Sequence, residues 1–172
     1  REKDGVTTWD CIWLGNYNQT ASWEQKPIEW RVLSVDGDDA FLLADRCLDA
    51  KLYHEEDEDV TWETCTLRKW LNEGFCNTAF TEKEKQAIKE TTVVSVWKDV
   101  DGEEYKVEGG NDTKDKVYLL SEKEASNSTY GFDTELGEES NTRQARTSDY
   151  VKVNGGNSEG LYCYWWLRSP SI

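Results

Sequence analysis

The sequence predicts an α+β fold of antiparallel sheets and hairpins with two to three short helices. Alternating apolar residues within 27–45 predict a hairpin, because successive strand side chains point to opposite faces. Two later segments carry the Ser/Thr-x-x-Glu spacing of a helix capping box. Strand-like and helix-like segments do not alternate regularly, which favours α+β over a parallel doubly wound sheet.

The first predicted elements are strands. Ile28, Trp30 and Val32 occupy alternate positions in PIEWRVLSV. The sequence DGDD then supplies a turn before the apolar run AFLLA, so we expect a hairpin. The preceding CIWLGNY is interpreted as a further strand.

A helix is predicted after the acidic run HEEDEDV. Thr61 can cap its start, and Leu67, Trp70 and Leu71 have the spacing of one helix face. Gly74 offers a stop for this helix.

Two capping boxes predict further helix starts, one with Thr81 and Glu84 and one with Ser121 and Glu124. The run KVYLL, directly before the second box, is interpreted as a short buried strand.

The segment TTVVSVWKDVDGEEYKV predicts a second hairpin that turns at Asp101 and Gly102. Asp99, Asp101 and Glu103 also alternate as the ligands of a calcium loop would. The glycine and glutamate that such a loop needs at its sixth and twelfth positions are missing, so the turn is favoured. We expect no cofactor and retain calcium at these three carboxylates as the alternative.

Composition excludes several classes of partner. The 172 residues suffice for one domain, taken as 1–172, with a hydrophobic core. The net charge of −15 would repel nucleic acid and anionic lipid. No apolar run approaches the ~20 residues of a membrane helix, so membrane insertion is not expected.

Side chains that could act in catalysis are sparse. His54, the only histidine, is interpreted as an exposed loop residue. The five cysteines form no C-x-x-C pair, which argues against a zinc ribbon or a redox motif. Two alternatives stay open for them: up to two disulfides with one free thiol, or five small buried hydrophobic residues.

The ligand-binding prediction rests on aromatic and polar residues near long loops. Residues 127–160 are rich in Ser, Asn, Gly and Asp and are interpreted as loop-dominated. Trp165 and Trp166 would face opposite sides of a strand, so one could contact a ligand. The candidate ligand-binding residues are Trp97, Tyr130, Asp149, Tyr150, Asn154, Asn157 and Trp166. The final YCYWWLRSPSI is otherwise interpreted as a core strand and turn, with Arg168 satisfying buried carbonyls or a carboxylate.

Six blocks together resemble a bacterial family known as domain of unknown function 6273, frequent in gut Firmicutes: PIEWRVLSVDGDDAFLLAD, LDAKLYH, VTWETCTLRKWLN, FCNTAFTEKEKQAI, DKVYLLSEKEA and YWWLRSPS. The resemblance implies a C-type-lectin-like fold on exported or surface proteins, without defined catalytic residues. It also implies that most signature residues are architectural. Members continue with further strands, so we expect this chain to lack its closing C-terminal strands.

The leading functional hypothesis is a non-catalytic extracellular or cell-surface module that binds a glycan or protein ligand. One alternative is a structural spacer or assembly domain that contacts neighbouring domains of a larger protein. The other is a cysteine-dependent enzyme related to formylglycine-generating enzymes, with Cys163 near the signature.

Overall fold

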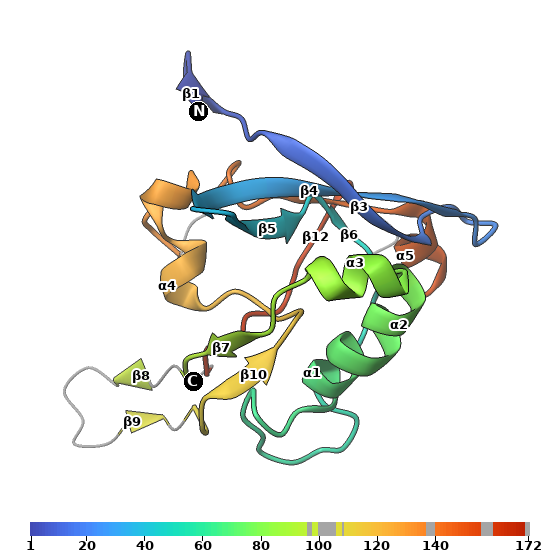
Figure 1. The fold of residues 1–172 in the computed structure, drawn as a ribbon. Coiled ribbons are helices and arrows are strands. Elements are labelled where there is room, and N and C mark those ends of the chain that lie inside the picture. Colours follow the sequence, from blue (N-terminus) through green and yellow to red (C-terminus); the bar gives the residue numbers. More distant parts are fainter. Residues whose placement is uncertain (96–97, 100–105, 108, 137–139, 156–159, 171–172) are drawn as a thin grey trace. The chain divides into compact units, whose positions relative to one another are not determined.

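The computed structural model describes residues 1–95, 98–99, 106–107, 109–136, 140–155 and 160–170 (Figure 1). The chain divides into two compact units, Arg1–Ala50 with Lys123–Trp165 and Lys51–Glu122 with Trp166–Ile172. The predicted α+β class is confirmed, because short helices accompany mainly antiparallel sheets. The lectin-like detail, the single domain and the missing closing strands stay predictions.

The first unit contains an antiparallel sheet in the order β3-β4-β5: β3 (Cys11–Asn18), β4 (Gln25–Asp36) and β5 (Asp39–Ala44). The predicted hairpin and its preceding strand are therefore confirmed (Figure 1). The predicted alternation is wrong at its end, because a register shift between Val32 and Ser34 buries Leu33 in place of Val32.

A second sheet in this unit has the order β12-β11-β6: β12 (Tyr162–Cys163), β11 (Ala145–Thr147) and β6 (Arg46–Cys47). The central β11 pairs antiparallel with β12 and parallel with β6. A disulfide between Cys47 and Cys163, whose Cα atoms are 6.7 Å apart, joins the two outer strands. Cys11, Cys65 and Cys76 are free, so neither alternative for the cysteines is fully correct.

Short elements complete the first unit: β1 (Glu2–Lys3), β2 (Val6–Thr7), η2 (Ser128–Tyr130) and α5 (Asp149–Val153). Helix α4 (Glu122–Ala125) begins at the last residue of the segment Lys51–Glu122, and its other residues belong to the first unit. The helix start predicted after Ser121 is confirmed by α4. In the described part of 127–160, most residues lie outside helices and strands, so the loop-dominated prediction is confirmed; η2, β11 and α5 are the short elements within it. Ser148 begins α5, because its hydroxyl accepts a hydrogen bond from the Val151 N–H at 3.2 Å.

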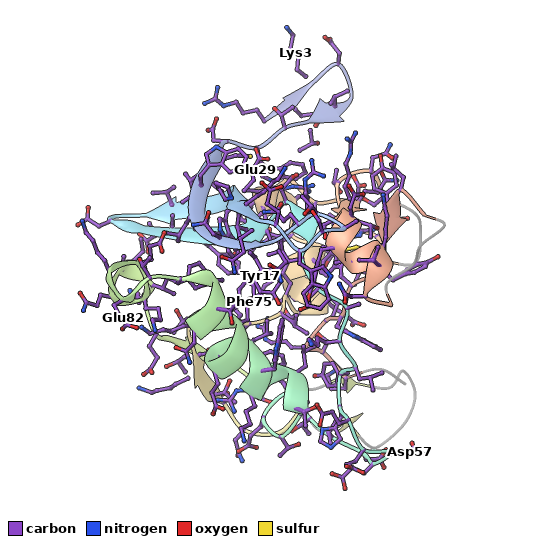
Figure 2. All side chains as sticks on the ribbon, turned by 90° about the vertical axis from the view of Figure 1, so that its right-hand side faces the viewer. Lys3, Tyr17, Glu29, Asp57, Phe75 and Glu82 are labelled. Atoms are coloured by element: carbon purple, nitrogen blue, oxygen red, sulfur yellow. A yellow bond between two sulfur atoms is a disulfide. The ribbon has the colours of Figure 1, made fainter. Side chains whose placement is uncertain are left out.

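The second unit has a continuous helical run followed by a separate helix: α1 (Thr66–Trp70), the π-helical turn η1 (Leu71–Phe75), α2 (Cys76–Ala79) and α3 (Glu82–Ala87). The capping box of Thr81 and Glu84 at α3 is confirmed. Figure 2 shows Glu82, at the start of α3, pointing outward from this unit.

Two predictions about the helical run are wrong. Thr61 does not cap the run, which begins at Thr66, where the Thr66 N–H donates to Nδ1 of His54 at 3.2 Å. The His54 side chain is only 12% exposed, so this residue supports the helix start and is not an exposed loop residue. Gly74 does not end the helix; a Cβ there would lie 2.9 Å from Cδ1 of Trp70, so close packing explains the glycine.

Four strands complete the second unit: β7 (Thr91–Val93), β8 (Lys98–Asp99), β9 (Lys106–Val107) and β10 (Thr113–Asp115). The pairing of β8 with β9 confirms the second hairpin, whose predicted turn lies outside the described residues. The prediction that KVYLL forms a strand is wrong, because β10 ends at the residue before this segment. Side chains bind its carbonyls instead: Asn72 Nδ2 donates to Val117 and Arg168 Nη1 donates to Leu119, both at 2.9 Å.

The predicted C-terminal core strand is also wrong. Only Tyr162 and Cys163 form a strand, while Tyr164 is 98% exposed and Trp166 is 51% exposed. The predicted role of Arg168 is confirmed, since this buried residue donates to the Leu119 carbonyl and, through its own N–H, to the Leu120 carbonyl.

Candidate functional site

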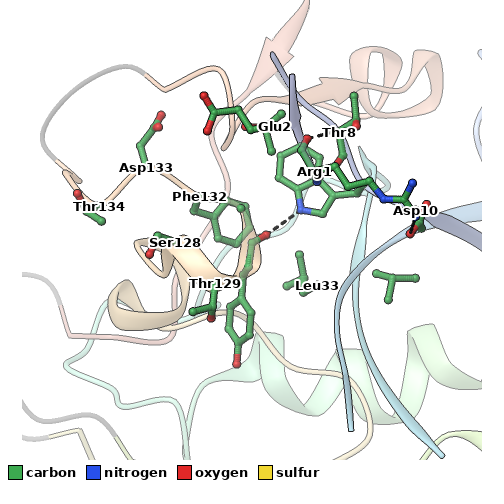
Figure 3. A pocket seen from close by; sticks show the side chains of 15 residues that line it. Arg1, Glu2, Thr8, Asp10, Leu33, Ser128, Thr129, Phe132, Asp133 and Thr134 are labelled. Carbon is green, nitrogen blue, oxygen red and sulfur yellow. Dashed lines mark hydrogen bonds and ion pairs between the residues drawn. The ribbon is translucent and has the colours of Figure 1, made fainter. Parts of the chain in front are cut away.

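A hollow of about 500 Å³ lies in the first unit (Figure 3). We call it the Trp9–Tyr130 hollow. Its lining consists of Arg1, Glu2, residues 7–10, Val32, Leu33 and residues 128–134. Segments more than a hundred residues apart in sequence therefore form one concave surface.

Trp9 is the rigid aromatic element of the hollow. Its indole N–H donates to the Tyr130 carbonyl at 2.8 Å, and the Arg31 guanidinium lies 4.8 Å from the ring centroid. Arg31 is itself fixed by a 2.7 Å ion pair with Asp45 and a 3.1 Å hydrogen bond to the Gln144 carbonyl. These contacts hold the indole before any ligand arrives.

The backbone beside Trp9 is shaped by η2. The Asn127 side chain caps this turn by accepting from the Thr129 N–H at 2.9 Å. Gly131 ends the turn with φ +88°, and a Cβ there would lie 3.1 Å from two atoms of the Trp9 indole. Both the backbone angle and the close approach to Trp9 therefore require glycine.

The polar rim of the hollow contains Asp133, an exposed carboxylate. It accepts hydrogen bonds from the hydroxyls of Ser140 and of Thr142, the latter at 3.2 Å. The Ser140 hydrogen bond is the main cause that lowers the pKa of Asp133 below its ordinary value of 3.8. Asp133 is therefore ionised at neutral pH and can accept hydrogen bonds from a ligand.

The predicted ligand-binding residues do not form one site. Tyr130 lines the hollow, whereas Asp149, Tyr150 and Asn154 lie on or next to α5. Tyr150 is buried, and Asn154 Nδ2 donates to the Tyr150 carbonyl at 2.9 Å, so both support α5. Asp149 is exposed and forms a 3.2 Å ion pair with Lys152.

Trp166 belongs to the second unit, where its indole N–H donates to the Lys51 carbonyl at 3.0 Å. Trp97, Asn157, Asp101 and Glu103 lie outside the described residues, and of Asp99 only the backbone is described, in β8. The calcium alternative thus stays a prediction. Within the described ranges, no three His, Cys, Asp or Glu side chains gather as metal ligands would.

The cysteines are weak candidates for nucleophiles. The disulfide leaves Cys163 without the thiol that the enzymatic alternative requires. Burial is the main cause that raises the pKa of Cys11, Cys65 and Cys76 above the ordinary value of 9.0. A raised pKa reduces the thiolate fraction and hence reactivity at neutral pH.

Comparison with known proteins identifies the family. Residues 37–172 match the family described as Domain of unknown function (DUF6273). The chain belongs to this family. No curated protein and no solved structure matches the chain. The DUF6273 match begins at the turn after β4, so Trp9 and the strands β3 and β4 precede it. In the described part of the chain, no helix has the length and apolar character needed to cross a membrane.

Sequence reasoning missed Trp9 and Asp133. The segment NSTYG did carry one usable signal, since Asn127 before a short turn and Gly131 after it are typical of helix capping. The approach of Trp9 to this turn left no local pattern, because the two segments are 121 residues apart.

Proposed function

We propose that this DUF6273 protein is a non-catalytic extracellular or cell-surface module that binds a neutral, hydroxyl-rich ligand, a glycan, in the Trp9–Tyr130 hollow. The C-type-lectin-like fold and the neighbouring domains of a larger protein remain part of the proposal.

One observation carries the proposal: polar groups surround a rigid aromatic wall. The hollow combines Trp9 and Tyr130 with the hydroxyls of Thr8 and Ser128 and the carboxylate of Asp133. A sugar presents hydroxyl groups that pair with such donors and acceptors, and C–H faces that pack against aromatic rings. Because Trp9 is already held by hydrogen bonding and cation–π contact, little ordering would oppose binding.

Charge narrows the class of glycan. The lining has the carboxylates Glu2, Asp10 and Asp133 and the single guanidinium of Arg1. The whole chain carries a net charge of −15. Anionic sugars would therefore be repelled, and a neutral glycan is favoured.

The proposed location is supported by the disulfide between Cys47 and Cys163. Disulfides persist in oxidising environments outside the cell and are rare in reducing cytosol.

The test is an array of neutral and acidic glycans, followed by titration of any glycan bound. In Ser128→Trp, a large ring enters the hollow from an exposed position, and at least tenfold weaker binding is expected. The matched control is Thr92→Trp, which adds the same ring at an exposed position of β7. Equal binding by wild type and Ser128→Trp would contradict the site. Binding only to a host protein or to a neighbouring domain would replace the glycan proposal.

A further inference from the structure

A second aromatic feature lies in the loop between β3 and β4. Trp23 has φ +63° and is 59% exposed. The left-handed backbone region is unfavourable for a bulky side chain and natural for glycine. A tryptophan held there at this cost indicates that its side chain is needed, and most of that side chain faces solvent.

The loop around Trp23 is held firmly by its own hydrogen bonds. The Trp23 N–H donates to the Thr20 carbonyl at 3.0 Å, and the Glu24 N–H donates to the Thr20 hydroxyl at 2.9 Å. Gln19 Nε2 donates to the carbonyls of Lys26 and Pro27 at 2.9 and 3.0 Å. The loop therefore presents Trp23 in a defined position.

Aromatic packing supports the ring from beneath. Trp23 meets Tyr150 edge to face, with centroids 5.4 Å apart, and Tyr150 meets Tyr17 in the same way at 6.0 Å. The Tyr17 hydroxyl donates to Asp49 at 2.5 Å. We call these three rings the Trp23 platform. Tyr150 and Tyr17 are buried, so Trp23 is the member that offers a surface to a ligand.

We propose that the Trp23 platform is a second, separate contact site that stacks against the C–H face of a neutral sugar ring. An indole face is electron-rich and attracts the weakly positive C–H groups of a sugar. The loop residues Ser22 and Glu24, and Gln25 at the start of β4, are polar and exposed, which suits the hydroxyl rim of a sugar. One anchoring ring among such residues is poorly suited to a protein partner, because protein interfaces bury about 800 Å² per side around an apolar centre.

The platform and the Trp9–Tyr130 hollow can be tested independently. Trp9 precedes β3 and Trp23 follows it, and the eight residues of β3 span roughly 25 Å. A single sugar ring cannot reach both sites. The proposal therefore does not depend on the hollow, and Ser128→Trp should leave binding at the platform intact.

The experiment is saturation-transfer NMR on the whole chain carrying Ser128→Trp, which fills the hollow, so that only binding outside the hollow is observed. The probes are methyl glycosides of glucose, galactose and mannose, with choline chloride as a cationic probe. We expect transfer to the C–H protons of at least one glycoside, reduced at least fivefold in Trp23→Gly and retained in Trp23→Tyr. Glycine accepts the backbone angle, so the loop should keep its shape. If Trp23→Gly fails to fold, Trp23→Asn takes its place, because asparagine also tolerates this region.

The matched control is Trp13→Thr, which removes another exposed tryptophan, 63% exposed, from strand β3. It should leave the transfer unchanged. No transfer to any glycoside, transfer to choline alone, or equal losses in Trp13→Thr and Trp23→Gly would overturn the proposal.

Discussion

The buried carboxylate of Asp115 in the second unit provides the sharpest test of the structural reasoning. Its side chain is 1% exposed and accepts from Arg68 Nε at 2.8 Å, from the Thr113 hydroxyl at 2.6 Å and from the Trp62 indole N–H at 3.1 Å. Asp115→Leu preserves approximate volume but leaves all three donors without this acceptor. The charge of Arg68, which is 26% exposed, also loses its carboxylate partner.

Breaking a buried ion pair by removing one partner costs about 3–5 kcal/mol. With a urea dependence of about 2 kcal/mol per molar, the unfolding midpoint of Asp115→Leu should fall by roughly 1.5–2.5 M. Urea unfolding followed by tryptophan fluorescence measures this change. Adding Arg68→Met removes the unpaired charge. The double variant should therefore lose at least about 1 kcal/mol less free energy of unfolding than the two single losses added together.

Glu82→Leu is the control within the same unit, because the Glu82 side chain is 86% exposed in its ion pair with Lys85. It should change stability by less than about 1 kcal/mol. A loss below about 1 kcal/mol for Asp115→Leu, or strict additivity in the double variant, would refute the assignment of Asp115 as the centre of a buried polar network.

Three further predictions follow from other contacts. Because hydrogen bonding lowers the folded-state pKa of Asp133, the stability it contributes is present above its ordinary value of 3.8 and is lost as the pH falls through the lower folded value. Ser140→Ala should raise that pKa, which NMR titration of the Asp133 carboxyl carbon measures. An unchanged pKa in this variant would contradict the prediction. Reduction of the Cys47–Cys163 disulfide, which spans 116 residues, should cost about 2–5 kcal/mol by urea unfolding; equal midpoints for oxidised and reduced protein would exclude this. Gly110→Ala should lower the melting temperature by several degrees, since φ is +82° and a Cβ would meet a side-chain oxygen at 2.5 Å; an unchanged melting temperature would show that the loop relaxes freely.

Three arginines in the blocks that carry the family resemblance, Arg31, Arg68 and Arg168, contact groups of the protein itself. Arg31 holds the Trp9 indole, Arg68 pairs with Asp115, and Arg168 binds carbonyls of the segment after β10. Each acts on the protein's own backbone or side chains, as the family resemblance implied for most signature residues. Ligand contact is therefore better sought at Trp9 and Trp23, which both precede the DUF6273 match.

The sequence by itself determined the features that depend on neighbouring residues. The alternation of β4, the turn before β5 and the capping box of Thr81 and Glu84 all follow from side-chain direction and from backbone groups within a few residues. The same local rules failed where strand pairing was irregular or where distant side chains supplied hydrogen bonds. A bulge shifted burial to Leu33, and side-chain donors occupied the carbonyls of KVYLL.

Only the tertiary structure decided the disulfide, the parallel pairing of β6 with β11, and the Trp9–Tyr130 hollow. The partners of the disulfide are 116 residues apart, and Trp9 meets Tyr130 across 121 residues. Closing such long loops costs entropy that many simultaneous packing contacts must offset. No short sequence pattern shows whether the packing contacts outweigh the entropy cost of closing the loop. The position of the candidate site is therefore known only from the folded chain.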